Sequence, residues 1–341
     1  MRLWNKTSCY KQLRKELRYS FRYYYEKGDN QYKEDYKMVF YSLLEFKENA
    51  NFKLRDLTYY EQLYRECVSD NPLLFYIENV TFSIGSFGVR MMFNYSYKWE
   101  QTEIIYKKIF SCVNRIRVQC SDDPEELKIG KIHDYIVENV EYDDSPDLPV
   151  HYSHSFFVYR KAVCDGISKA AKILMDGVSI KSIVIYGDAT TPNSFDDNLG
   201  HAWNIVWIND RPSHYDFTFD NNLSLSKEIV RYDYYSLSDE QIRQDHKYSD
   251  LGIVFSESKN DWFVQNGLYF TKKVEIRKHV YSRLKNGEKY IAFKLPNTKN
   301  RRATLDSIID IVKDEIRSYI SGAVSYSLSI NEAQMVVYIF L

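Results

Sequence analysis

The sequence lacks the features of several large protein classes. Its five cysteines are odd in number and none are spaced as C-x-x-C, so no disulfide framework is expected. His133, His151 and His154 have no paired thiols at ligand spacing, which argues against structural zinc. No Walker A pattern, dinucleotide-binding glycine fingerprint or H-E-x-x-H motif occurs. We therefore expect neither a metal nor another cofactor.

Long apolar runs and a large net charge are also missing. No stretch of about 18 apolar residues occurs, so no transmembrane segment is expected. The formal net charge of the 341 residues is −1, which gives the whole chain no field that would attract nucleic acid. The first residues lack the apolar segment and cleavage site of a signal peptide, so we expect a cytoplasmic protein. The sequence leaves the oligomeric state open.

Residues 1–27 are the local exception to this balance of charge. They hold eight Lys or Arg against two Glu, a net of +6. This segment is either a basic arm that contacts a partner or a membrane, or a helix with a solvated basic face. Leu13, Leu17, Phe21 and Tyr24 form an apolar face opposite the charges. The amphipathic pattern favours the helix.

Hydrophobic patterning divides the chain into three predicted domains. Residues 1–120 mix helices and strands, residues 121–254 form a central core, and residues 255–341 end in a β-α-β-β order. Residues 52–97 have a similar order, so we expect two related modules to flank the core. The 31 Tyr and 19 Phe suit strands and half-buried surfaces.

The central region has identifiable helix and strand boundaries. Asp123 and Pro124 mark a helix start, and Gly177 marks a helix end. A long polar connection spans residues 187–200. The other expected elements are a helix over 167–176, strands over 180–186, 202–208 and 212–219, and, near the C-terminus, a helix capped by Thr304 between strands at 289–295, 324–330 and 334–340.

Cys164 lies immediately before the helix predicted over 167–176. A thiol becomes a useful nucleophile as the thiolate, which a helix N-terminus stabilises through its free N–H groups. The negative charge of Asp165 opposes this effect unless its carboxylate is occupied in capping the helix. Gly166 leaves room for another part of the chain to approach closely.

His201 and Asp216 lie on two predicted strands joined at Asn209 and Asp210. If Ile208 pairs with Arg211, His201 and Asp216 are diagonal neighbours on one face of the ladder. That separation suits a carboxylate that accepts a proton from an imidazole and fixes its tautomer. A loop longer by one residue would place them on opposite faces. The spacing is therefore compatible with a His–Asp dyad.

Three stretches resemble the signature segments of the transglutaminase-like superfamily. They are A-V-C-D-G-I-S-K-A-A-K-I-L-M-D-G-V at 162–178, G-H-A-W-N-I-V at 200–206 and H-Y-D-F-T-F-D at 214–220. Residues 132–143 are similar to a helix and strand entry common in bacterial members. The resemblance implies an α+β, papain-like fold in which a helix bearing the cysteine packs on an antiparallel sheet. It also implies that Cys164 is the nucleophile, His201 the base and acid, and Asp216 the residue that orients His201.

The sequence departs from the family pattern at two places. Phe219 stands where bacterial relatives often have Trp, and no Tyr occurs in the stretch 154–157 before the cysteine. The backbone N–H of Cys164 is the first candidate for stabilising an oxyanion, and His154 or Tyr159 is a candidate for the second donor. We interpret His133, His214 and Asp220 as structural.

Three functions remain open at this point. The first is cysteine-dependent acyl transfer or hydrolysis on protein or peptide amides through a Cys164 thioester, by a transglutaminase, deamidase or peptidase. The second is a non-catalytic binding module that uses the same cleft, against which the complete Cys-His-Asp set argues. In the third, the basic N-terminal segment binds a partner and the core serves as its scaffold.

Overall fold

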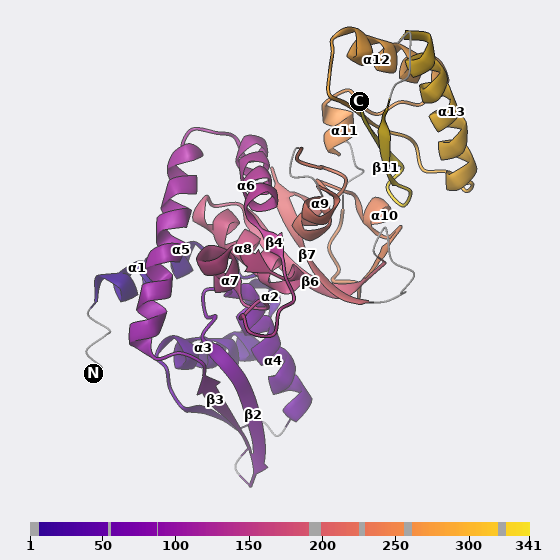
Figure 1. Ribbon diagram of the computed structural model, residues 1–341. Helices are drawn as coiled ribbons and strands as arrows, with labels where there is room; N and C mark the ends of the chain where they lie inside the picture. The colour runs from indigo at the N-terminus through magenta and orange to yellow at the C-terminus, as the bar shows by residue number, and fades with distance from the viewer. Residues whose placement is uncertain are drawn as a thin grey trace. The chain divides into compact units, whose positions relative to one another are not determined.

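The computed structural model describes residues 7–53, 56–86, 88–190, 199–224, 229–255, 261–319 and 325–341. The fold is α+β, as the resemblance implied (Figure 1). The chain divides into two compact units. The first comprises Met1–Tyr186, His201–Pro212 and Asp216–Val230, and the second comprises Gly187–Gly200, Ser213–Tyr215 and Arg231–Leu341. The division into three domains at residues 120 and 254 stays a prediction.

The first unit begins with three helices and a small sheet. Its elements up to the core are α1 (Ser8–Tyr19), α2 (Tyr23–Lys27), α3 (Asn30–Leu44), β1 (Asn49–Phe52), α4 (Leu57–Asp70), β2 (Ile77–Gly85) and β3 (Gly88–Tyr95). The strands form an antiparallel sheet in the order β1-β3-β2. Gly88 has φ +128°, and a Cβ there would lie 1.8 Å from the carbonyl oxygen of Phe52, so only glycine fits this crossing point.

The N-terminal segment packs against the body of the first unit. Leu13 and Leu17 are buried, which confirms the apolar face of α1. Lys172 of the core donates to the carbonyl oxygen of Phe21 at 2.9 Å, and Arg22 Nε donates to Asn71 Oδ1 at 2.9 Å. The described part of this segment is therefore a packed amphipathic helix and linker. Arg2 and Lys6 lie outside the described residues.

The core of the first unit surrounds one buried helix. Its elements are α5 (Trp99–Gln119), α6 (Glu125–Asn139), β4 (Glu141–Tyr142), α7 (Ser153–Tyr159), β5 (Lys161–Ala162), α8 (Cys164–Gly177), β6 (Lys181–Ala189), β7 (Leu199–Ile208), β8 (Arg211–Tyr215) and α9 (Phe217–Leu223). The end of β6, the start of β7 and the end of β8 are assigned to the second unit. Helix α8 is buried along most of its length and packs against α5, α6, α7 and α9. Strands β8, β7 and β6 are successive neighbours in one sheet, followed by β9 (His246–Lys247).

The second unit contains the C-terminal module. Its remaining elements are α10 (Asp239–Ile242), α11 (Trp262–Gln265), α12 (Lys273–Lys285), β10 (Tyr290–Lys294), α13 (Arg301–Tyr319), β11 (Ser327–Asn331) and β12 (Val336–Phe340). The three strands form an antiparallel sheet in the order β10-β12-β11. Helices α12 and α13 pack on this sheet around an apolar core that includes Val280, Phe293 and Val312.

Several expected boundaries are corrected by the structure. The cysteine helix begins at Cys164 rather than at residue 167, and helix α13 begins at Arg301, so Thr304 lies inside its first turn. The strand expected over 212–219 ends at Tyr215, because Asp216 caps a new helix. Residue 324, the expected start of a strand, lies outside the described residues.

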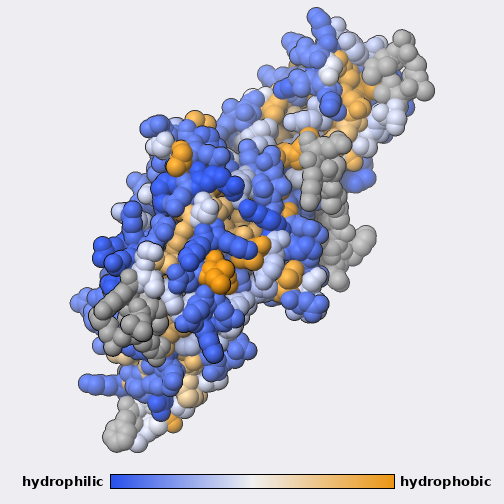
Figure 2. All heavy atoms as spheres, turned by 60° about the vertical axis from the view of Figure 1, so that its left-hand side comes forward, coloured by the Kyte–Doolittle hydropathy of each residue, from blue (hydrophilic) through white to orange (hydrophobic). Residues whose placement is uncertain are grey.

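Hydrophobic side chains at the surface are scattered. Val118, Leu127 and Ile84 are among the large apolar residues that are more than half exposed. The face shown in Figure 2 is mostly hydrophilic, with small hydrophobic groups between charged side chains. Within the described residues, no helix combines the length and apolar character needed to cross a membrane.

Candidate active site

Cys164 is the first residue of helix α8, with Val163 as the N-cap. Its thiol therefore lies at the end of the helix where N–H groups lack partners inside the helix and the helix dipole is positive. The side chain is partly exposed, whereas Cys9, Cys67, Cys112 and Cys120 are buried. Burial raises the pKa of the Cys9 thiol to about 11 and also raises the pKa of Cys120. The partly exposed thiol is thus the one at the start of α8.

The carboxylate of Asp165, whose charge would oppose a thiolate at Cys164, bonds two partners. Lys169 Nζ lies 2.7 Å from Asp165 Oδ2, and the hydroxyl of Tyr186 donates to Asp165 Oδ1 at 2.9 Å. The expected alternative, in which Asp165 caps the helix, does not apply because Asp165 is already inside it. Its charge is compensated by a cation one turn along.

Gly166 permits close contact between the helix start and the preceding loop. A Cβ at this position would lie 2.3 Å from the carbonyl oxygen of Val150 and 3.0 Å from the Cβ of Ala162. Any side chain here would push the loop away from α8. The close approach expected from the sequence is therefore present.

Two polar side chains fasten α8 to the sheet. Ser168 Oγ donates to the carbonyl oxygen of Ala202 at 2.9 Å, and Asn204 Nδ2 donates to the carbonyl oxygens of Ser168 and Ile183 at 3.1 and 3.2 Å. All these groups are buried, so each bond is shielded from water. The bond to Ala202 fixes α8 next to His201. Sequence reasoning did not single out Ser168 or Asn204, although both lie inside the signature stretches.

Asp216 is held by the helix that it caps. Strands β7 and β8 are joined by Asn209 and Asp210, which both have positive φ, as a two-residue hairpin turn requires. At the end of β8, Asp216 Oδ1 accepts from the backbone N–H groups of Thr218 and Phe219, both at 3.0 Å. The Oδ1 atom therefore anchors the Asp216 side chain at the start of the helix.

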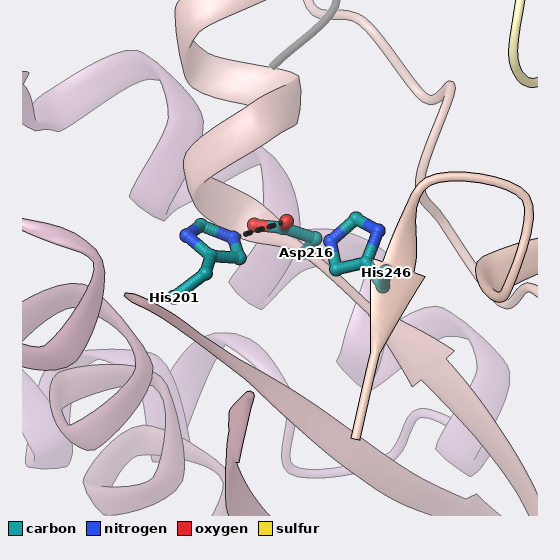
Figure 3. Close-up of side chains that lie close together, drawn as sticks. All are labelled: His201, Asp216 and His246. Atoms are coloured by element: carbon teal, nitrogen blue, oxygen red, sulfur yellow. Dashed lines mark hydrogen bonds and ion pairs between the residues drawn. The ribbon is translucent and has the colours of Figure 1, made fainter. Parts of the chain in front are cut away.

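His201 and Asp216 are brought together. His201 Nε2 lies 2.7 Å from Asp216 Oδ2, and the two side chains are 8% and 0% exposed (Figure 3). Asp216 thus engages Nε2 of the His201 ring. The interaction with Cys164 is one of the causes that raise the pKa of His201. His246, also drawn in Figure 3, belongs to the second unit, where its Nδ1 bonds Asp245.

The surroundings of His201 favour its protonated form. Burial lowers the pKa of the imidazole, but the charge and hydrogen bond of Asp216, followed by the interaction with Cys164, raise it to about 10. The Asp216 and Cys164 contacts thus outweigh desolvation. An imidazolium beside the thiol would in turn favour the thiolate.

Aromatic rings hold the His201 imidazole in place. Phe219 lies with its ring centroid 4.6 Å from that of His201, and Trp203 lies at 5.9 Å in a stacked arrangement. Phe219, which departs from the family pattern, therefore packs directly on the imidazole. A flat apolar neighbour limits rotation of the ring without competing for its nitrogens.

His154 and Tyr159, the two candidates for a second oxyanion donor, differ in their exposure to solvent. His154 is 1% exposed, and its Nε2 pairs with the hydroxyl of Tyr97 at 3.2 Å. Tyr159 is 46% exposed near the end of α7. Tyr142 is a phenol that sequence reasoning missed: burial and then the charges of Cys164, Asp144 and Asp216 raise its pKa.

Helix α9, which Asp216 caps, also takes part in a second histidine–carboxylate pair. His133 Nε2 is 3.0 Å from Asp220 Oδ2, with side chains 1% and 0% exposed, and His133 Nδ1 is 3.2 Å from Asp134. Asn221 adds bonds to the carbonyl oxygens of Val137 and Val140. This pair joins α6 to α9.

The family comparison agrees with this geometry. Residues 113–217 match the model of the transglutaminase-like superfamily. That segment includes Cys164, His201 and Asp216. The match covers 105 of the 341 residues, so this part of the chain is similar to the transglutaminase-like superfamily.

Two solved structures are similar to parts of the chain. One is described as a candidate cysteine protease from Cytophaga hutchinsonii, with 13% identity, a TM-score of 0.28, and coverage of 41% of this chain and 61% of that chain. The other is described as a TGase, with 12% identity, a TM-score of 0.30, and coverage of 50% of each chain. The similarity thus spans less than two thirds of either structure. No curated protein matches the chain.

Proposed function

We propose that this protein is a cysteine-dependent enzyme that cleaves or transfers the acyl group of protein or peptide amides, with Cys164, His201 and Asp216 as its catalytic triad. The observation that carries the proposal is the hydrogen-bonded His201–Asp216 pair next to a thiol at a helix N-terminus. A nucleophile, a base and an orienting carboxylate at one site are what such a triad requires.

In the first step, the Cys164 thiolate attacks the carbonyl carbon of an amide. A C–S bond forms, and the negative charge moves to the carbonyl oxygen, where the backbone N–H of Cys164 is the first donor. The C–N bond then breaks as the His201 imidazolium gives its proton to the leaving amine or ammonia. The product is a thioester on Cys164 and a neutral His201.

In the second step, water or an amine attacks the thioester. Neutral His201 takes a proton from the attacking group, the C–S bond breaks, and Cys164 leaves as the thiolate. Throughout, Asp216 holds the imidazole and stabilises its charged form. Water gives hydrolysis or deamidation, whereas a lysine amine gives a cross-link.

The proposal is tested by trapping the thioester. Purified protein is incubated with glutamine-containing peptides and a mixed peptide digest, and intact mass spectrometry follows Cys164 while ammonia release, amine incorporation and peptide cleavage are assayed. We expect an acyl adduct on Cys164 that hydroxylamine removes, and no adduct in Cys164→Ala. Peptides bound equally by wild type and Cys164→Ala, with no adduct or turnover, would instead support the binding-module function.

The three-domain organisation is part of the same proposal. Limited proteolysis should release fragments ending near residues 120 and 254 if these are domain boundaries. The expected cytoplasmic location would be checked by cell fractionation.

A further inference from the structure

A cavity of about 360 Å³ lies in the first unit beside the start of helix α8. Its walls come from α4, from the chain before and into β2, from the loop entering α7, and from α8 itself. The lining residues are Tyr64, Val68, Pro72, Leu74, Phe75, Ile77, Glu78, His151, Tyr152, Ser153, Asp165 and Lys169. Of these, Asp165 directly follows Cys164.

Apart from Glu78, the wall supplied by the N-terminal residues is mainly apolar, and hydrogen bonds hold part of it in place. Val68 lies on α4, and Leu74 and Phe75 follow that helix as buried side chains. Two hydrogen bonds hold this segment in place. Ser153 Oγ donates to the carbonyl oxygen of Pro72, and the hydroxyl of Tyr106 donates to the carbonyl oxygen of Leu73. An apolar surface that is already fixed binds an apolar group with little cost of ordering.

The opposite wall is fastened to the start of α8. The backbone N–H of Val163 donates to Val150 at 3.2 Å, and the missing side chain of Gly166 lets the loop at 150–152 lie against the helix. Lys169 Nζ bonds the carbonyl oxygen of His151 at 3.3 Å as well as Asp165. The cavity therefore borders the turn of α8 that begins with Cys164.

The charges around the cavity oppose an anionic ligand. The one lysine in the lining, Lys169, is paired with Asp165, and exposed Glu78 adds a second carboxylate. A negatively charged side chain would meet this excess negative charge. An uncharged apolar side chain would instead replace water against Val68, Leu74 and Phe75.

We propose that this cavity binds a leucine-like or phenylalanine-like side chain of the peptide whose amide Cys164 attacks. The inference rests on the function proposed above and adds the substrate class to it. The volume is at the lower end of ligand pockets, which suits one bulky side chain rather than a folded domain. Residues of the N-terminal region would thereby select substrates for the core.

The test uses peptide chloromethyl ketones, which alkylate a cysteine without requiring turnover. Two series are compared, acetyl-X and acetyl-X-Gly chloromethyl ketones, with X as Phe, Leu, Ala or Asp. Mass spectrometry gives the rate of Cys164 alkylation, normalised to the rate with iodoacetamide. In at least one series, we expect Phe and Leu to exceed Ala by about tenfold or more, and Asp to be slowest.

Variants locate the preference in the cavity. Val68→Trp fills the cavity and should bring the Phe-to-Ala ratio close to one, while Val68→Lys should raise the relative rate of the Asp probe. The matched control is Val118→Trp on α5, where the valine is 75% exposed and outside the cavity lining. That variant should keep the wild-type ratio.

The outcomes separate this inference from the proposed function. Equal normalised rates for all four probes in both series, or a Phe-to-Ala ratio unchanged in folded Val68→Trp and Val68→Lys, would overturn the cavity proposal alone. Failure of iodoacetamide and of every probe to label Cys164 would overturn both, because the thiol would then be neither reactive nor accessible.

Discussion

Helix α9 carries two carboxylates that each bond a histidine, and the two pairs differ in their surroundings. Asp216 caps the helix and bonds His201 at 2.7 Å, whereas Asp220 lies in its first turn and bonds His133 at 3.0 Å. His201 also interacts with a partly exposed thiol. His133 is closed in, with Asp134 at its other nitrogen and the ring of Phe217 at 5.8 Å.

The comparison shows that the pairing itself does not distinguish a reactive histidine from a structural one. The pKa is raised in both imidazoles, against the effect of burial, because a carboxylate bonds each ring. The partners differ: the His133 ring has acidic partners at both nitrogens, whereas the His201 ring bonds Asp216 at Nε2 and its pKa is also raised by Cys164. We expect changes at His201–Asp216 to alter chemistry and changes at His133–Asp220 to alter stability.

The largest effect is expected from Asp216→Asn. Asparagine caps a helix about as well as aspartate, so the bonds to Thr218 and Phe219 should survive. The amide, however, holds the wrong imidazole tautomer and lacks the charge that stabilises the imidazolium, so acyl transfer should fall by up to about 10⁴. Turnover of the peptide identified by thioester trapping, with thermal unfolding as the check on folding, measures this change. Wild-type turnover in the variant would mean that Asp216 does not orient His201.

The corresponding substitution in the second pair, Asp220→Asn, should lower the free energy of unfolding rather than the rate of turnover. Removing one partner of a buried ionic pair costs about 3–5 kcal/mol, because the other group is left without compensation. Urea unfolding of the first unit, followed by tyrosine and tryptophan fluorescence, measures that loss. Turnover per folded molecule should stay within about tenfold of wild type. A large loss of turnover with unchanged stability would show that the two pairs cannot be separated in this way.

The raised pKa of His201 predicts how stability depends on pH. A histidine whose folded pKa lies above its unfolded value of about 6.5 stabilises the fold fully below that pH and loses the contribution as pH rises. For His201, the loss is complete as pH passes about 10. The free energy of unfolding should therefore fall between about pH 6.5 and 10, less steeply in His201→Gln.

His154→Gln is the control for this slope. Burial lowers the pKa of His154 to about 4, so it stays neutral over the whole alkaline range. Its replacement can shift stability but should leave the alkaline slope at the wild-type value. A slope unchanged in His201→Gln would contradict the assignment of the raised pKa to His201.

The smallest expected effect is on thiol reactivity. Iodoacetamide should label Cys164 about tenfold or more faster than Cys9 and Cys120 at pH 7, because their thiols have a raised pKa. Asp216→Asn should slow labelling of Cys164, while Asp220→Asn should not. Peptide mapping by mass spectrometry reads every thiol in one experiment. Equal rates for Cys164 and the buried thiols would count against activation.

The modules built on strands β1–β3 and β10–β12 show how much of the fold the sequence pattern predicts. Both have the order β-α-β-β, and in both the last strand lies between the other two, as β1-β3-β2 and β10-β12-β11. Apolar periodicity indicated both. Their interiors differ: the C-terminal core is apolar, whereas α4 ends at buried Asp70, which accepts from Tyr24, Tyr25 and Tyr36. Periodicity did not predict that polar cluster, since its partners come from separate helices.

Local chemistry in the sequence determined much of the candidate site. The cysteine at a helix start, the Asn209–Asp210 turn and the glycine needed at 166 depend on near neighbours along the chain. The end of β8 was missed because Tyr215, Phe217 and Phe219 alternate like a strand, although Asp216 is a good N-cap residue. Two local preferences competed there, and tertiary packing selected the helix.

Only the tertiary structure decided which groups share each environment. Lys169 follows Asp165 by one helical turn, so that ion pair is local. The hydrogen bonds from Tyr186 to Asp165 and from Ser168 to Ala202, and the cavity beside α8, instead join segments far apart in the chain. The same holds for the difference between His201 and His133. Burial and charge at a ring depend on every element packed around it, and those contacts exist only once the chain has folded.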